Sequence, residues 1–289
     1  MKTFLKRYQI IIFFVLTFVI SWYPWYSGGE GFFAWGPSAA GLIVTAAVAG
    51  RKGITLMLRR LIRWRAKFRY WAVAIFGPIV VMLTGIGIYI LAGGEAPPFT
   101  FWKEEWYLAP VLMLVFLAPM FGPGGEEPFG WRGYAQPKLQ EIFSRWWGPL
   151  LTSFIIGTAW GVWHLPEFFN PSSTQYALGI GFLGPFIVME ISNSIVMTWL
   201  YNKTGASVLI AGVVYHVMLD LSSTLLLDVT LTGMMSGKVV PTPDLGLLWL
   251  QVVVMAIVAI IFVIATKGRL GFAAKGKTES ETSTQIVNP

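Results

Sequence analysis

The sequence predicts an all-α membrane protein that crosses the bilayer several times. Hydrophobic residues make up 55% of the 289 positions and charged residues only 12%, which is too little polar surface for a soluble domain of this size. Long apolar runs recur along the chain, and none shows the alternating pattern of a membrane β-barrel strand. Helices satisfy their backbone hydrogen bonds internally, so they are the expected spanning structure.

About eight apolar segments approach the roughly 20 residues that a helix needs to cross the hydrocarbon core, the fourth being short. They are expected to form a single transmembrane domain over residues 1–270. In chain order the segments are Gln9–Trp25, Phe32–Gly50, Trp71–Ala92, Trp106–Phe121, Trp147–Pro166, Leu178–Tyr201, Ala206–Leu227 and Gly246–Thr266.

The first segment follows a basic start, as a secretory signal peptide would. It leads into the aromatic stretch Ser21–Tyr26, which is typical of a membrane interface, and no cleavage site of small residues follows. We therefore expect the first helix to be retained. At the other end, residues 271–289 are polar and are expected to form a disordered cytoplasmic tail.

Lys and Arg are concentrated in alternate loops, which predicts the orientation of the helices. The N-terminus, the loops after the second, fourth and sixth segments and the tail are basic, whereas the intervening loops are poor in Lys and Arg. The positive-inside rule then places both termini in the cytoplasm. This distribution explains the formal charge of +7 without a nucleic-acid partner. Within the second of these basic regions, Arg59–Arg69 is either an amphipathic surface helix touching anionic lipid or a solvated loop.

The chain has no cysteine, which excludes disulfides, thiolate metal sites and a cysteine nucleophile. It has two histidines, and both lie in apolar stretches, where an ionisable ring is costly and indicates a functional site by default. His164 ends the fifth segment close to Trp160, and the alternative role is that of an interfacial histidine. His216 lies within the seventh segment, with Asp220 one turn later on the same helical face. That carboxylate could fix the tautomer of the ring, or the pair could join two helices.

Three acidic residues also accompany apolar segments. Glu126 and Glu127 are adjacent, so one could stay protonated while the other is ionised, which suits general acid and base catalysis. The alternative is that the two carboxylates lie at a helix end at the membrane interface and form salt bridges with Arg132 and Lys138.

Glu190 and Asn193 are one turn apart in the sixth segment. They either face the same cavity as the histidines or serve as buried partners of Arg132 or of other helices.

Three stretches, GEEPFGWRGYAQPKLQ, WGVWHLP and YNKTGASVLIAGVVYHVMLD, resemble the motif blocks of the CPBP family. These are intramembrane proteases that include the type II CAAX prenyl endopeptidases, and the similarity covers about residues 122–222. The resemblance implies an eight-helix fold and a glutamate-dependent endopeptidase. We expect no cofactor. A Glu of the first block and His164 would activate water, while His216 and Asp220 would stabilise the oxyanion. Arg132 would orient the neighbouring carboxylate.

The resemblance also implies partners and a location. Membrane lipid and a membrane-associated or lipidated protein or peptide are the expected partners, and an integral position in a prokaryotic cell membrane is the expected location. Zinc is the less favoured cofactor, because two His and two Glu could hold it but the HExxH spacing is absent. The alternative functions are a catalytically silent relative acting as an immunity or scaffold protein, and a proton-coupled transporter.

Three departures from the family pattern concern the site. The family places the Arg four residues after the second Glu, whereas Glu127 and Arg132 are five apart, so either Glu126 or Glu127 is the catalytic carboxylate. Trp160 replaces the usual Phe. Asp220 replaces the common Asn, and only a protonated Asp could donate to an oxyanion. Asp220 could instead orient His216 and leave the imidazole as the donor.

The predicted segments conflict with a shared site. Glu126 falls at the cytoplasmic end of the fourth segment and His164 near the outer end of the fifth, across a core of about 30 Å. If the family resemblance holds, either the fourth segment continues as helix through Arg132, with a kink at Pro123 or Pro128, or the fifth is displaced. We expect the carboxylates and both imidazoles to line one cavity.

Overall fold

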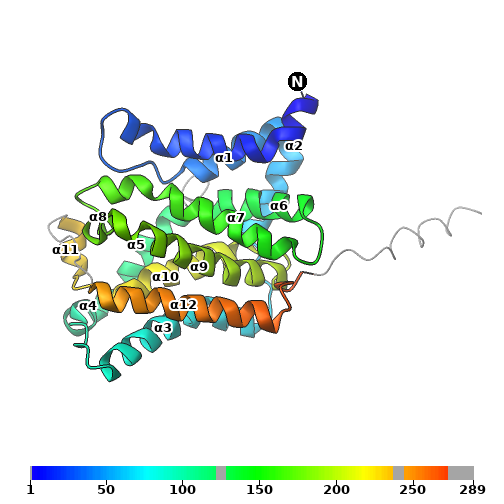
Figure 1. Ribbon diagram of the computed structural model, residues 1–289. Coiled ribbons are helices and arrows are strands. Elements are labelled where there is room, and N and C mark those ends of the chain that lie inside the picture. The colour runs from blue at the N-terminus through cyan, green and yellow to red at the C-terminus, as the bar shows by residue number, and fades with distance from the viewer. Residues whose placement is uncertain (1, 122–127, 237–243, 273–289) are drawn as a thin grey trace, which may run out of the picture.

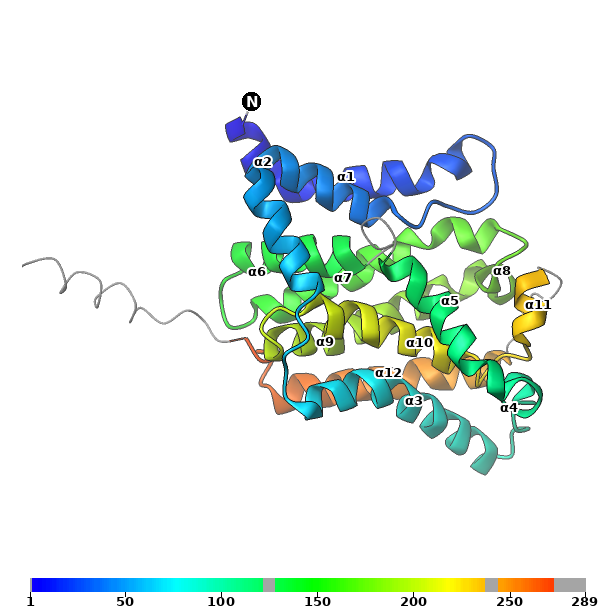
Figure 2. The same ribbon diagram turned by 180° about the vertical axis from the view of Figure 1, so that it is seen from behind.

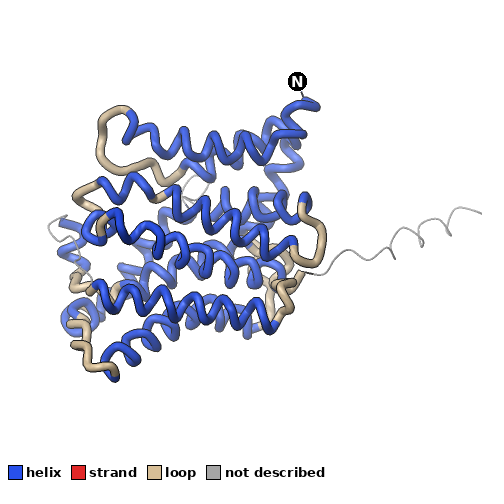
Figure 3. Tube along the Cα trace, in the orientation of Figure 1, coloured by secondary structure: helices blue, strands red, loops and turns tan. Residues whose placement is uncertain are grey.

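The structure, a computed structural model, describes residues 2–121, 128–236 and 244–272, and all regular structure in these ranges is helical. The long helices lie side by side in stacked rows, joined by loops at the two ends of the bundle (Figures 1 and 3). The α-helices are α1 (Lys2–Tyr26), α2 (Gly36–Leu61), α3 (Phe68–Leu91), α4 (Thr100–Glu104), α5 (Ala109–Phe121), α6 (Gln136–Ile142), α7 (Gly148–Trp163), α8 (Thr174–Leu178), α9 (Leu183–Lys203), α10 (Tyr215–Ser223), α11 (Leu231–Ser236) and α12 (Leu245–Ala265).

Shorter helical turns connect these elements. Three are 3-10 turns, and two are π-helical segments that run directly into the next α-helix. The 3-10 turns are η1 (Trp106–Leu108), η3 (Leu165–Phe169) and η4 (Ile180–Phe182), and the π-helical segments are η2 (Phe129–Ala135) and η5 (Leu209–Val214).

The predicted all-α polytopic class is confirmed. Five helical stretches are long and apolar enough to cross a membrane, and two shorter apolar helices accompany them. The number of spans and the cytoplasmic position of the termini stay predictions, and most of the predicted tail, residues 273–289, lies outside the described residues. The five long stretches are Phe4–Tyr26, Gly36–Leu61, Phe68–Leu91, Ile180–Lys203 and Leu245–Ala265, and the shorter ones are Trp106–Met120 and Leu209–Ser223.

The second predicted segment ends at Gly50, but helix α2 continues to Leu61. Gly50 has φ 58° and ψ −154°, a conformation that favours glycine, and it kinks the helix at the predicted boundary. The chain from Arg63 to Lys67 is then non-helical, and α3 begins at Phe68. Arg59–Arg69 is therefore not a surface helix, because only its two ends belong to helices.

Arg132 is one of the basic residues counted in the predicted loop after the fourth segment, and this placement in a loop is wrong. Its side chain is only 1% exposed, and it lies in η2, which packs against α2 and leads into α6. Pro128 already has helical φ and ψ, so the chain is helical from there to Ile142. Arg132 is therefore in a helix, as expected, but the predicted continuation from the fourth segment and its kink at Pro123 fall on residues 122–127, outside the described residues. Helices α5 and α6 lie toward opposite ends of the bundle (Figure 2).

Helix α9 occupies the centre of the fold. It packs against α7 on one side and α12 on the other, and it also contacts η5 and α3. Most of its second half is buried, including polar residues such as Asn193, Ser194 and Thr198. Polar side chains inside an apolar bundle need partners there, so this helix is where a polar site can form.

Two glycines one turn apart allow α7 to approach α9 closely. A Cβ at Gly157 would lie 2.4 Å from the Cα of Ile191, and a Cβ at Gly161 would lie 2.9 Å from the Cα of Ile187. Small residues at this spacing are a common device for backbone contact between membrane helices. The contact brings the end of α7, which carries Trp160 and His164, against α9.

We expect Gly157→Ala to lower the stability of the protein by about 1–3 kcal/mol, because its Cβ meets backbone that cannot move aside. Thermal unfolding of the purified full chain in detergent measures the change. Gly87→Ala in α3 is the matched control, since a Cβ at Gly87 meets nothing within 4 Å. Equal melting temperatures for the two variants would contradict the role given to the α7–α9 contact.

Candidate active site

A cavity of about 280 Å³ lies between α7, α9 and α10, with α3, α8 and α12 at its edges. Six of the residues predicted for the site line it, although they come from three helices that are separated in sequence. They are Trp160, His164, Glu190, Asn193, His216 and Asp220. Both imidazoles line this cavity, as expected, whereas Glu126 and Glu127, which were expected there too, lie outside the described residues.

His164 follows directly after the last residue of α7. The helix has 16 residues and therefore rises about 24 Å, which is less than the thickness of a full hydrocarbon core. Nδ1 of the ring is 2.9 Å from the carbonyl oxygen of Trp160. Because a carbonyl only accepts, Nδ1 carries the proton, and Nε2 is the acceptor of the neutral ring. This tautomer suits an imidazole that accepts a proton or a hydrogen bond from water.

The ring of Trp160 contacts the rings of both histidines. The centroid of its ring lies 5.3 Å from that of His216 in an edge-to-face arrangement and 6.3 Å from that of His164. Such contacts fix the orientation of all three rings. Its position four residues before His164 places it one helical turn away, on the same side of α7.

His216 and Asp220 lie on one face of α10, as their spacing predicts. Nε2 of His216 is 3.8 Å from Oδ1 of Asp220, which is within ion-pair distance but longer than a hydrogen bond. The side chain of Asp220 is 34% exposed, whereas that of His216 is 10% exposed. Both groups reach the cavity, so a small polar group there could contact the two together.

Glu190 and Asn193 line the cavity, and Asn193 also takes part in a contact between helices. Oε2 of Glu190 is buried and has no hydrogen-bond partner among the described residues. Asn193 accepts a hydrogen bond of 3.3 Å from the hydroxyl of Tyr215, the residue before His216. A buried carboxylate is costly to keep, which is a reason to expect a role for Glu190 in the site.

Arg132 is held by polar groups in the interior. It donates to Oε1 of Gln136 at 2.9 Å, to Oγ of Ser194 at 3.2 Å and to Sδ of Met197 at 3.1 Å. Oε1 of Gln136 also accepts from Thr198, so the guanidinium is tied to α9 at several points. Gln136 is not among the predicted site residues. Its position four residues after Arg132, on the same face of a helix, could have indicated the contact.

Glu126 and Glu127, the predicted water-activating pair, lie outside the described residues. The described chain resumes at Pro128, which packs against η5 at Gly212. A Cβ at Gly212 would lie 2.9 Å from Cβ of Pro128 and 3.3 Å from Cγ of Arg132. Gly212 precedes His216 by four residues, so the first motif block meets the third one turn from the imidazole.

Comparisons with known proteins agree with this geometry. The family model described as type II CAAX prenyl endopeptidase, Rce1-like, matches residues 105–222, which include all three motif blocks. A relative from Methanococcus maripaludis, "CAAX prenyl protease 2", is 27% identical over 242 residues, covering 76% of this chain and 86% of its own. The chain is thus similar to the type II CAAX prenyl endopeptidase family over residues 105–222, and to this relative over most of its length. These matches support a membrane protease, and the described residues include five helical stretches long and apolar enough to cross a membrane.

The close contact at Gly212 predicts an effect on proteolysis. We expect Gly212→Ala to displace Pro128 and Arg132 and to lower kcat roughly tenfold to hundredfold, because small displacements of catalytic groups have effects of this size. Proteolysis by the reconstituted enzyme measures it. Gly184→Ala, where a Cβ meets nothing within 4 Å, should leave the rate unchanged. Full activity of the folded Gly212 variant would show that the contact does not position the site.

Proposed function

We propose that the protein hydrolyses a peptide bond in or next to the membrane in a lipidated or otherwise membrane-associated protein. One observation carries the proposal: the imidazoles of His164 and His216 face one cavity, with the ring of Trp160 in contact with both. The archaeal relative is named a CAAX prenyl protease, which favours a prenylated C-terminal segment as the substrate.

In the proposed reaction, Glu126 or Glu127 takes a proton from a water molecule while Nε2 of His164 accepts a hydrogen bond from it. The water oxygen attacks the carbonyl carbon of the scissile bond, and the carbonyl electrons move to the oxygen. After the carbon–nitrogen bond breaks, the proton held by the glutamate passes to the leaving amine. No covalent intermediate with the protein is needed.

His216 and Asp220 are proposed to stabilise the oxyanion. The 3.8 Å between Nε2 and Oδ1 lets both groups contact one oxygen, with Nε2–H as one donor. Asp220 can be the second donor only in its protonated form. Arg132 is proposed to act as a positioning residue for the glutamate that takes the proton.

The two glutamates can be distinguished by amide variants. We expect one of Glu126→Gln and Glu127→Gln to lower kcat by about 10²–10⁴, the usual range for loss of a general base, and the other to have a smaller effect. Mass spectrometry of a prenylated peptide cleaved by the full chain in liposomes measures the rates. Glu141→Gln is the matched control, because Glu141 is exposed and pairs only with Lys138 among the described residues.

The same assay tests the cofactor prediction. We expect His164→Ala to lower the rate to a similar extent and a chelator to leave the wild-type rate unchanged. Among the described residues, no group of three or more His, Asp or Glu is placed to hold a metal. Chelator-sensitive cleavage would favour zinc, and unchanged cleavage in all glutamate and histidine variants would reject the proposed site.

Asp220→Asn tests the oxyanion role. An amide can donate a hydrogen bond to the oxyanion without being protonated, so we expect the variant to cleave as fast as or faster than wild type. The rate of peptide cleavage in liposomes measures this. A large loss of rate would instead show that Asp220 acts by orienting His216.

A further inference from the structure

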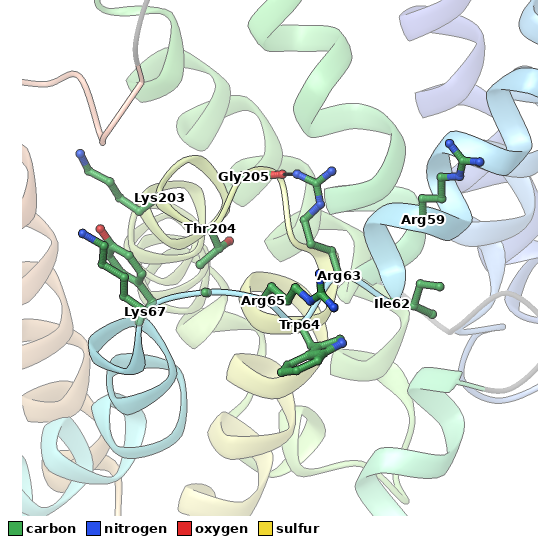
Figure 4. Close-up of a pocket in the computed structure, with 11 residues that line it drawn as sticks. Arg59, Ile62, Arg63, Trp64, Arg65, Lys67, Lys203, Thr204 and Gly205 are labelled. Atoms are coloured by element: carbon green, nitrogen blue, oxygen red, sulfur yellow. Dashed lines mark hydrogen bonds between the residues drawn. The ribbon is translucent and has the colours of Figure 1, made fainter.

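A second pocket lies at the end of the bundle, away from the catalytic cavity. It has a volume of about 630 Å³ and is formed by the end of α2, by the loop from Ile62 to Lys67, and by the turn after α9 (Figure 4). Its five cationic side chains come from all three segments. They are Arg59, Arg63, Arg65, Lys67 and Lys203.

Among the described residues, no acidic side chain neutralises the positive charge of this pocket. No Asp or Glu lines it, and the sequence has none at all between Glu30 and Glu95 or between Glu190 and Asp220. The ion pairs among the described residues involve none of the five cations. Like charges held this close repel each other, so an anionic ligand would be favourable here.

Hydrogen bonds to the turn after α9 hold the loop in place. Arg63 donates through Nη1 to the carbonyl oxygen of Gly205, and the hydroxyl of Ser207 donates to the carbonyl oxygen of Arg63. The same hydroxyl accepts from the backbone N–H of Ile210 at the start of η5. Gly205 has a φ of 67°, which favours glycine at this turn. The pocket is therefore a built feature with two anchored walls.

Large apolar side chains stand exposed beside the cations. Ile62 is 68% exposed and Trp64 is 61% exposed. The guanidinium of Arg65 lies 5.7 Å from the ring centroid of Trp64. Trp next to Arg or Lys is typical of the boundary between lipid headgroups and acyl chains, where each part of the pair meets its preferred surroundings.

We propose that this pocket binds the phosphate group of an anionic phospholipid. The cations contact the headgroup, and Ile62 and Trp64 contact the glycerol and upper acyl region. A free phosphate ion would use the cations but would leave both apolar side chains facing water, so the lipid is the better match. The loop lies at the end of the bundle that carries the basic segments, which the positive-inside rule assigns to the anionic cytoplasmic leaflet.

The experiment measures lipid retention by the full chain. The purified protein in nonionic detergent is titrated with phosphatidylglycerol or with phosphatidylcholine of the same acyl chains, and bound lipid is counted by native mass spectrometry. We expect phosphatidylglycerol to bind more tightly. Arg65→Gln/Lys67→Gln should weaken it roughly twentyfold, because each cation near a membrane surface contributes about fivefold. Neither side chain makes a hydrogen bond to another described residue, so this variant should fold.

Matched variants separate the pocket from general surface charge. Arg51→Gln/Lys52→Gln removes the same charge from exposed positions of α2 outside the pocket and should change binding less than twofold. Lys203→Gln, on the opposite wall, should weaken binding about fivefold. Equal losses in the two double variants would overturn the proposal, as would equal binding of the two lipids. Displacement by inorganic phosphate, beyond that by chloride at equal ionic strength, would show a phosphate site in place of a lipid site.

Discussion

The close contact between α7 and α9 is the constraint on which the site depends. Gly157 and Gly161 have no side chain to keep the two helices apart, so the backbones meet at Ile187 and Ile191. That contact places the end of α7, with Trp160 and His164, directly beside Glu190. Larger residues at the two glycines would separate the groups that now share a cavity.

A buried polar cluster around Arg132 then fixes the position of the first motif block. The guanidinium of Arg132 is held by Gln136 and by the polar face of α9, while Gly212 lets its chain lie against η5. Polar groups in an apolar bundle have no water to bond to, so these contacts specify one arrangement strongly. The helix that carries His216 is thereby set against the first motif block. The contacts that pack these helices together are therefore also the contacts that set the geometry of the site.

The two ends of the molecule have different physical characters. The cavity is small and mostly enclosed by apolar and aromatic side chains, which strengthens the electrostatic effect of each polar group inside it. The basic pocket is exposed and suited to the charged membrane surface. The turn from Lys203 to Ser207 connects them, because it forms one wall of the pocket and leads into η5 and then to His216.

The sequence by itself determined the all-α membrane class, the family resemblance through three motif blocks, and six of the side chains that line the cavity. Apolar runs and chemically unusual residues are local properties, so a single chain reveals them. It misplaced Arg132 in a loop, because counting charges cannot distinguish a solvated arginine from one buried among Gln136, Ser194 and Met197. Only the tertiary structure decided that the ring of Trp160 contacts that of His216 and that Gly212 meets Pro128 and Arg132. Those facts depend on contacts between helices, and the spacing along one helix does not encode them.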